Sequence, residues 1–87
     1  MVVRLDFDKP LRPSKHFRNR WMRRWDWDMH ELRTGLKESH KTVKVGPRKF
    51  EVYTRHGARR GGSRKLILVD YPEEIFVISG AEGSDQQ

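Results

Sequence analysis

The chain has 87 residues, of which 34% are hydrophobic and 36% are charged, and its formal net charge at neutral pH is +7. A chain of this length forms one domain and buries only about 60–65% of the surface that its unfolded form exposes. It has no cysteine, which excludes disulfides, zinc–thiolate sites and thiol catalysis. Three Trp, four Phe and two Tyr supply enough apolar surface for a compact core.

Positive charge is confined to the first three quarters of the chain. All 19 Lys and Arg residues lie between Arg4 and Lys65 with seven of the 12 acidic residues, so this part carries +12. Residues 66–87 hold the other five acidic residues and no Lys or Arg, and so carry −5. Such a field attracts phosphate backbones, which predicts a polyanionic partner, RNA or, as an alternative, DNA. The other interpretation is a solvated thermophile-like surface, although such surfaces usually balance the two signs.

Several classes of protein are not expected. No 18 apolar residues run together, and the first residues form no apolar run typical of a signal sequence, so no membrane partner is predicted. A small domain without disulfides is normal in the cytoplasm, which is the expected location. The four His residues have no metal-ligand spacing, and the glycines between Gly57 and Gly62 precede no helix. No metal and no other cofactor is therefore predicted.

Residues 1–13 are expected to form an N-terminal arm or an edge strand. They contain an alternating stretch over residues 3–7, in which apolar and charged side chains take turns. Two prolines follow, Pro10 and Pro13, and Pro10 is expected to end any strand in this segment because proline cannot donate a ladder hydrogen bond.

A first helix of about three turns is expected after Ser14, which is a good N-cap. An apolar stripe then recurs every four residues, at Phe17, Trp21 and Trp25. This stripe is expected to pack on one face of the sheet that follows, with the basic side chains of the helix turned away from it.

A second, shorter helix is expected after Asp28. Asp28 begins a capping-box pattern that ends on Glu31, whose side chain is expected to reach back to the cap. The apolar side chains of this helix are Met29, Leu32 and Leu36. Gly35 is expected to weaken the helix by about 1 kcal/mol relative to Ala.

After residue 39 the pattern changes to strands, which are expected over residues 42–45, 49–54, 65–69 and 75–78. The third is apolar on both faces and should be the central, most buried strand. The chain is thus predicted to be a single α+β domain over residues 1–80, followed by a disordered acidic tail over 81–87. Two N-terminal helices pack in two layers on an antiparallel sheet of about four strands, whose other face is open to a ligand or partner.

The first candidate site lies on the first helix. His16, Arg20 and Arg24 follow one another at spacings of four residues, which places them one turn apart on one helix face, with Arg23 beside them. A His that titrates near neutral pH beside guanidinium groups suits proton transfer at a bound phosphate, as in RNA cleavage through the 2′ oxygen. The alternative is a packed or capping His16 with solvated arginines.

The second candidate site lies where the second predicted strand meets a glycine-rich basic loop over residues 57–63. Aromatic and basic groups together can grip a nucleic-acid backbone and stack a base. The candidate residues are Tyr53, Arg55, His56, Arg59, Arg60, Arg64 and Lys65. The alternative is a mobile hairpin loop whose charges serve solubility.

The order of these features resembles the small domains grouped near RelE and BrnT toxins, with helices followed by an antiparallel sheet. The likeness covers about residues 14–80 and rests on the His16-x3-Arg20-x3-Arg24 helix, a short second helix, a basic strand pair and the last two strands. It implies metal-independent endoribonuclease activity and a small acidic antitoxin as partner. His16, Arg20 and Arg24 match the helix pattern, whereas Arg55 and Lys65 occupy similar basic sheet positions.

Whether the protein cuts RNA or only holds it stays open at this point. The first alternative is a non-catalytic module that binds DNA or ribosomal RNA. The second is an interaction domain whose basic face meets an acidic protein.

Overall fold

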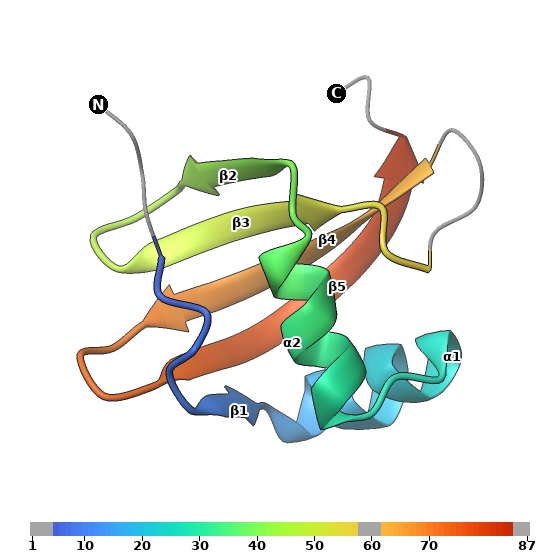
Figure 1. The fold of residues 1–87 in the computed structure, drawn as a ribbon, viewed down its shortest axis with the longest axis horizontal. Coiled ribbons are helices and arrows are strands. Elements are labelled where there is room, and N and C mark those ends of the chain that lie inside the picture. The colour runs from blue at the N-terminus through green and yellow to red at the C-terminus, as the bar shows by residue number, and fades with distance from the viewer. Residues whose placement is uncertain (1–4, 58–61, 85–87) are drawn as a thin grey trace.

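The computed structural model describes residues 5–57 and 62–84, and in this part the chain has an α+β fold (Figure 1). A five-stranded sheet has the order β1-β5-β4-β3-β2, with β1 parallel to β5 and the other neighbours antiparallel. The strands are β1 (Leu11–Pro13), β2 (Lys41–Lys44), β3 (Lys49–Thr54), β4 (Gly62–Asp70) and β5 (Ile75–Ser84). The helical segments are η1 (Phe17–Met22), α1 (Arg23–Trp25) and α2 (Met29–Lys37).

The sheet differs from the predicted antiparallel meander of about four strands, because the N-terminal segment adds a parallel strand. Leu11 pairs with Ile75, and the N–H of Ile75 donates to the carbonyl of Pro10 at 2.9 Å. Pro10 therefore precedes the strand instead of ending one, and Pro13 is tolerated because β1 lies at the sheet edge. The alternating residues 5–7 lie outside any strand, and residues 1–4 lie outside the described part.

The first helix begins as predicted but contains a π-helical segment, η1, before the single turn of α1. Ser14 caps it: its hydroxyl accepts from the N–H of Phe17 at 3.0 Å and donates to the carbonyl of Ile78 at 2.6 Å. The second of these bonds ties the helix start to β5. The helix ends at Asp26, whose φ of 57° is left-handed, a conformation that Asp tolerates better than most residues.

The second helix, α2, begins at the predicted cap. The Asp28 carboxylate accepts from the N–H of Glu31 at 2.8 Å, whereas the Glu31 side chain binds His56 instead of turning back to the cap. Gly35 is buried under the Trp27 indole: a Cβ at position 35 would lie 2.8 Å from Cη2 of that ring. Trp27 is accordingly only 7% exposed, although its sequence position between two Asp suggests an exposed ring.

The helical segments share one hydrophobic core with the sheet, and α2 crosses one face of the sheet in Figure 1. The core between them includes Phe17, Trp25, Leu32, Leu36, Val52, Leu66, Leu68, Ile75 and Val77. β4 is the central strand, as predicted, but its residues Ile67 and Val69 point to the other face and are only half-buried. β5 continues to Ser84, past the predicted end of the domain at residue 80, and residues 85–87 lie outside the described part.

Candidate functional site

The exposed side of η1 holds two of the three residues predicted to form a catalytic helix face. His16 and Arg20 line one open groove of about 510 Å³, together with Lys15 and Asn19. The guanidinium of Arg20 lies 5.3 Å from the centre of the Trp21 ring. An imidazole, an amide and two cations therefore face the same open groove, which suits the binding of a phosphate group.

Arg24 is not part of this groove. Its Nε donates to Oε1 of Glu82 at 2.8 Å, which ties α1 to β5. The hydrogen bond from Arg24 is the main cause that lowers the pKa of Glu82, and the charge of Arg64 acts in the same direction. Arg24 is thus already neutralised by a carboxylate, so the structure separates it from His16 and Arg20.

Along η1 and α1, four cations have no carboxylate partner in the described part of the chain. We call Lys15, Arg18, Arg20 and Arg23 the η1–α1 cations; all four are exposed. By contrast, carboxylates hold the cations of the pairs Lys9–Asp70, Arg12–Glu74, Lys37–Asp8 and Arg24–Glu82. A smaller group of exposed cations without a carboxylate partner in the described residues lies around the β2–β3 hairpin, at Lys44, Arg48 and Lys49. π-Helical turns within helices are frequent at functional sites.

The second predicted site does not form one cluster. Tyr53 and Lys65 are cross-strand neighbours on the sheet face that points away from the helices. Arg64, next in the chain, points to the helix side, and Arg55 follows β3 and is exposed. Arg59 and Arg60 lie outside the described residues.

Arg64 is a packing residue in this structure. Its guanidinium lies 4.8 Å from the Trp25 ring and 5.5 Å from the Trp27 ring, and burial lowers its pKa. Its Nε is buried without a hydrogen-bond partner. Gly57 has a φ of +68°, and a Cβ there would lie 2.7 Å from Nη1 of Arg64, so both backbone and space require glycine. The Arg64 guanidinium therefore stacks on the rings of Trp25 and Trp27 at one end of the core.

His56 is also occupied by structural contacts. Its Nε2 lies 2.7 Å from the carboxylate of Glu31 on α2, and its Nδ1 lies 3.5 Å from the carboxylate of Glu38, which follows α2. The ring also contacts Trp27, at 5.6 Å between centres. These contacts join the segment after β3 to the helix α2 and its C-terminal cap.

Tyr53 and Lys65 lie on the face of the sheet that the helices do not cover, and we call this face the open face. Its strand residues include Arg12, Lys41, Val43, Lys49, Glu51, Tyr53, Lys65, Ile67, Val69 and Phe76. Rows of side chains run across the strands, for example Lys41, Tyr53 and Lys65. Glu51 is the one acidic residue of this set, against four cations.

Tyr53 is held in place on this face. Its hydroxyl donates to Oε1 of Glu51 at 3.1 Å, so the ring extends along β3, and the ammonium of Lys41 lies 5.1 Å from the ring centre. Partial burial is the main cause that raises the pKa of Tyr53, and the contact with Glu51 adds to it. Tyr53 therefore stays a neutral, hydrogen-bonded ring at physiological pH.

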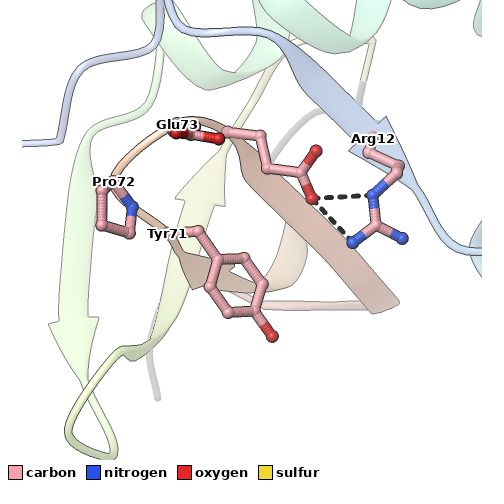
Figure 2. A pocket seen from close by; sticks show the side chains of 5 residues that line it. Arg12, Tyr71, Pro72 and Glu73 are labelled. Atoms are coloured by element: carbon pink, nitrogen blue, oxygen red, sulfur yellow. Dashed lines mark hydrogen bonds and ion pairs between the residues drawn. The ribbon is translucent and has the colours of Figure 1, made fainter.

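Sequence reasoning missed Arg12 and Phe76, which form a layered pair on the open face. The guanidinium of Arg12 lies 4.1 Å above the Phe76 ring. Glu74 binds one edge of that guanidinium, at 2.7 Å from Nε and 2.6 Å from Nη2, and dashed lines mark these contacts at Arg12 in Figure 2. The alternation of the last strand already indicates that Phe76 points away from Ile75, but nothing in the sequence places Arg12 beside it.

The same Arg12 borders an open groove of about 480 Å³ at the β4–β5 turn (Figure 2). The other lining residues are Tyr71, Pro72, Glu73 and Glu74. Two carboxylates make this groove unfavourable for a phosphate, because like charges repel. It therefore marks the acidic border of the open face.

Comparison of the chain with protein-family models, curated proteins and solved structures found no match. The resemblance to RelE and BrnT toxins therefore stays a prediction. In the described residues no group of three or more His, Asp or Glu side chains lies close enough to hold a metal ion. Within the same part of the chain, no helix has the length and apolarity needed to cross a membrane.

Proposed function

We propose that the protein binds RNA and that the η1–α1 cations hold its phosphate backbone. One observation carries this proposal: four exposed cations along a single helix have no carboxylate partner in the described residues, while Arg24 in the same helix has one. An unneutralised row of cations favours a polyanion because binding releases the counterions of the nucleic acid. Asn19 and His16 add hydrogen-bonding groups in the groove beside Arg20.

The proposal is tested by replacing all four η1–α1 cations with Gln and titrating a labelled single-stranded RNA at several salt concentrations. If all four contact phosphates, the slope of log affinity against log salt falls in magnitude by up to about 3. The control replaces Lys44 and Arg48 with Gln, which removes charge at the hairpin but leaves the open-face cations in place; we expect this variant to keep most of the slope.

Three outcomes contradict the proposal. One is wild-type protein that binds no RNA, and another is binding that does not change with salt. The third is an equal loss of affinity per removed charge in the two charge variants, which indicates attraction by net charge alone. A DNA oligonucleotide of the same sequence, titrated in parallel, distinguishes an RNA-binding module from the DNA-binding alternative.

A second candidate function is metal-independent RNA cleavage, which the resemblance to RelE and BrnT toxins implies. The observation that favours it is the shared groove of His16 and Arg20. In this reaction the 2′ oxygen attacks phosphorus and the 5′ oxygen leaves, so one proton is removed and another delivered. Purified protein incubated with RNA in EDTA should produce cleavage that His16→Ala abolishes while RNA binding persists. Intact RNA after incubation with wild-type protein eliminates this candidate.

A further inference from the structure

The open face carries a first flat surface at Tyr53. The ring lies along β3, fixed by its hydrogen bond to Glu51, and has only apolar or cationic side chains across the strands beside it. A ring fixed in this way loses little further freedom when a flat ligand stacks on it. Aromatic rings on an exposed sheet face are a common platform for unpaired bases.

A second flat surface is formed by Arg12 on Phe76. One face of the guanidinium covers the Phe76 ring at 4.1 Å, and Glu74 occupies only a guanidinium edge. The outer face of the guanidinium is left to solvent, since the Arg12 side chain is 55% exposed. Guanidinium planes stack on bases as aromatic rings do. Arg12 is thus oriented for stacking before any ligand arrives.

The positions of the two surfaces decide what kind of nucleic acid they fit. Tyr53 pairs with Lys65 and Phe76 pairs with Val69, so the two rings are two strands apart and four residues apart along β4. In a flat sheet this places them about 16 Å from each other. Bases stacked within a helical strand are only about 3.4 Å apart. Within such a stack both faces of a base are covered by its neighbours, so bases that lie on both surfaces must have left the stack and belong to a strand that is splayed open.

We infer that the open face stacks the unpaired bases of single-stranded RNA at Tyr53 and at the Arg12–Phe76 pair. This inference rests on the proposed function and names its ligand class. The charge of the face fits a polyanion: its strand positions hold four cations and the carboxylate of Glu51, and a net positive charge remains when Glu74, which binds Arg12, is also counted. Between the two surfaces lie Ile67 and Val69, which offer apolar contact to bases and sugars; the carboxylate of Glu51, opposite Ile67, accepts the Tyr53 hydrogen bond.

The open face is also continuous with the η1–α1 cations. Arg12 and Lys15 are three residues apart in the chain, so their backbones are within about 10 Å of each other. The bond from Ser14 to Ile78 fixes this corner where β1 leads into the helix. One RNA strand can therefore stack bases on the open face and continue past Lys15 with its phosphates on the helix.

The test uses variants that remove a stacking surface and keep the net charge. Tyr53→Val keeps a side chain suited to a strand, and Arg12→Lys keeps the cation but not the plane. The matched control is Tyr71→Val, which removes the other tyrosine, at the acidic groove. Each protein is titrated with a labelled single-stranded RNA and with the same strand annealed to its complement, after circular dichroism has shown a native fold.

We expect wild-type protein to prefer the single strand. Tyr53→Val and Arg12→Lys should each weaken that binding by about tenfold or more, with the salt slope unchanged, while Tyr71→Val has no effect. Should either substitution unfold the protein, the other one decides the matter. If both variants unfold, the test is made on the wild-type protein by NMR. RNA should then change the chemical shifts of the Tyr53 ring protons, and unchanged shifts refute the inference.

The remaining outcomes separate the inference from the function on which it rests. Equal binding of single strand and duplex, with both variants like wild type, overturns base stacking but leaves RNA binding by the helix intact. Absence of any RNA binding removes both. A third outcome is a wild-type dimer in sedimentation that RNA does not dissociate and that Tyr53→Val makes monomeric. It assigns the open face to a second copy of the chain and also overturns stacking.

Discussion

At the scale of single residues, the contact between Gly35 and Trp27 shows how a position that looks unfavourable in sequence is required by packing. A glycine within α2 costs about 1 kcal/mol in helix propensity relative to Ala. A methyl group at position 35 would, however, lie 2.8 Å from the buried Trp27 ring. Overpacking of a core typically costs about 1–3 kcal/mol, so the clash outweighs the gain in propensity.

We therefore expect Gly35→Ala to lower the free energy of unfolding by up to about 2 kcal/mol, measured by urea denaturation. The same change in a Trp27→Phe background should be neutral or stabilising by up to about 1 kcal/mol, because the smaller ring leaves room for the methyl group. If Gly35→Ala is equally destabilising in both backgrounds, contact with Trp27 is not the reason for the glycine.

The ion pair between Glu82 and Arg24 should make the stability of the fold depend on pH in the acidic range. Its pKa lies below the ordinary value of 4.5, chiefly because Arg24 donates a hydrogen bond to it. The ionised form is thus favoured by folding: the stabilisation is present above about pH 4.5 and is lost as the pH falls through the lower, folded-state pKa. Since the pair is exposed, its contribution is about 0.2–1 kcal/mol.

Glu82→Gln should accordingly be less stable than wild type at pH 7 by this small amount, and the difference should vanish as the pH falls through the lowered pKa of Glu82. Urea midpoints measured at several pH values test this expectation. The control is Glu73→Gln at the exposed β4–β5 turn, because the Glu73 carboxylate itself forms no ion pair in the described residues and no such convergence is expected. A stability difference for Glu82→Gln that is constant with pH contradicts the assignment.

At the scale of elements, the parts predicted best are those whose signal lies within a few neighbouring residues. The cap at Asp28, the strand over Lys49–Thr54 and the central place of β4 follow from local patterns of capping, alternation and hydrophobicity. An edge strand within residues 1–13 was one of two predicted alternatives, but it was expected before Pro10; β1 lies after it, at Leu11–Pro13, and three residues are too short for a period to show. Its pairing also depends on Ile75, more than 60 positions away.

The π-helical segment was missed for a related reason. The aromatic stripe of the first helix fits an ordinary α-helix, and only the packed structure shows the wider turn over Phe17–Met22. The candidate sites were also predicted best where their residues are near in sequence: His16 and Arg20 line one groove, as their spacing of four residues suggests. Arg24 was lost from the predicted site to a distant carboxylate, Glu82, which nothing in its own neighbourhood indicates.

The predicted loop cluster failed because neighbours on a strand point to opposite faces. Lys65 lies on the open face, whereas Arg64 stacks on tryptophans at the helix side. Alternation was available from the sequence and could have separated the two. The layered pair of Arg12 and Phe76 could not have been found, since it requires the parallel register of β1 and β5.

At the scale of the whole molecule, the N-terminal segment fastens the helix layer to the sheet. Leu11 is buried, and Leu5 and Phe7 pack against the core. Arg33 of α2 donates to the carbonyls of Phe7 and Lys9, at 2.5 and 3.1 Å. The ammonium of Lys9 also binds the carboxylate of Asp70 at the end of β4 and the carbonyl of Tyr71, the next residue.

A shortened chain that begins at Ser14 should therefore lose more than an arm. It loses the β1 strand, the buried side chain of Leu11 and the hydrogen bonds made by Lys9 and Arg33. We expect the free energy of unfolding to fall by about 3 kcal/mol or more. Small domains have only about 5–15 kcal/mol in total, so the melting curve should become broad or lose its transition. The matched control begins at Leu5, keeps every contact named above and should melt like the full chain. A cooperative, unshifted transition in the chain that begins at Ser14 would show that the sheet and helices hold together without their N-terminal strand.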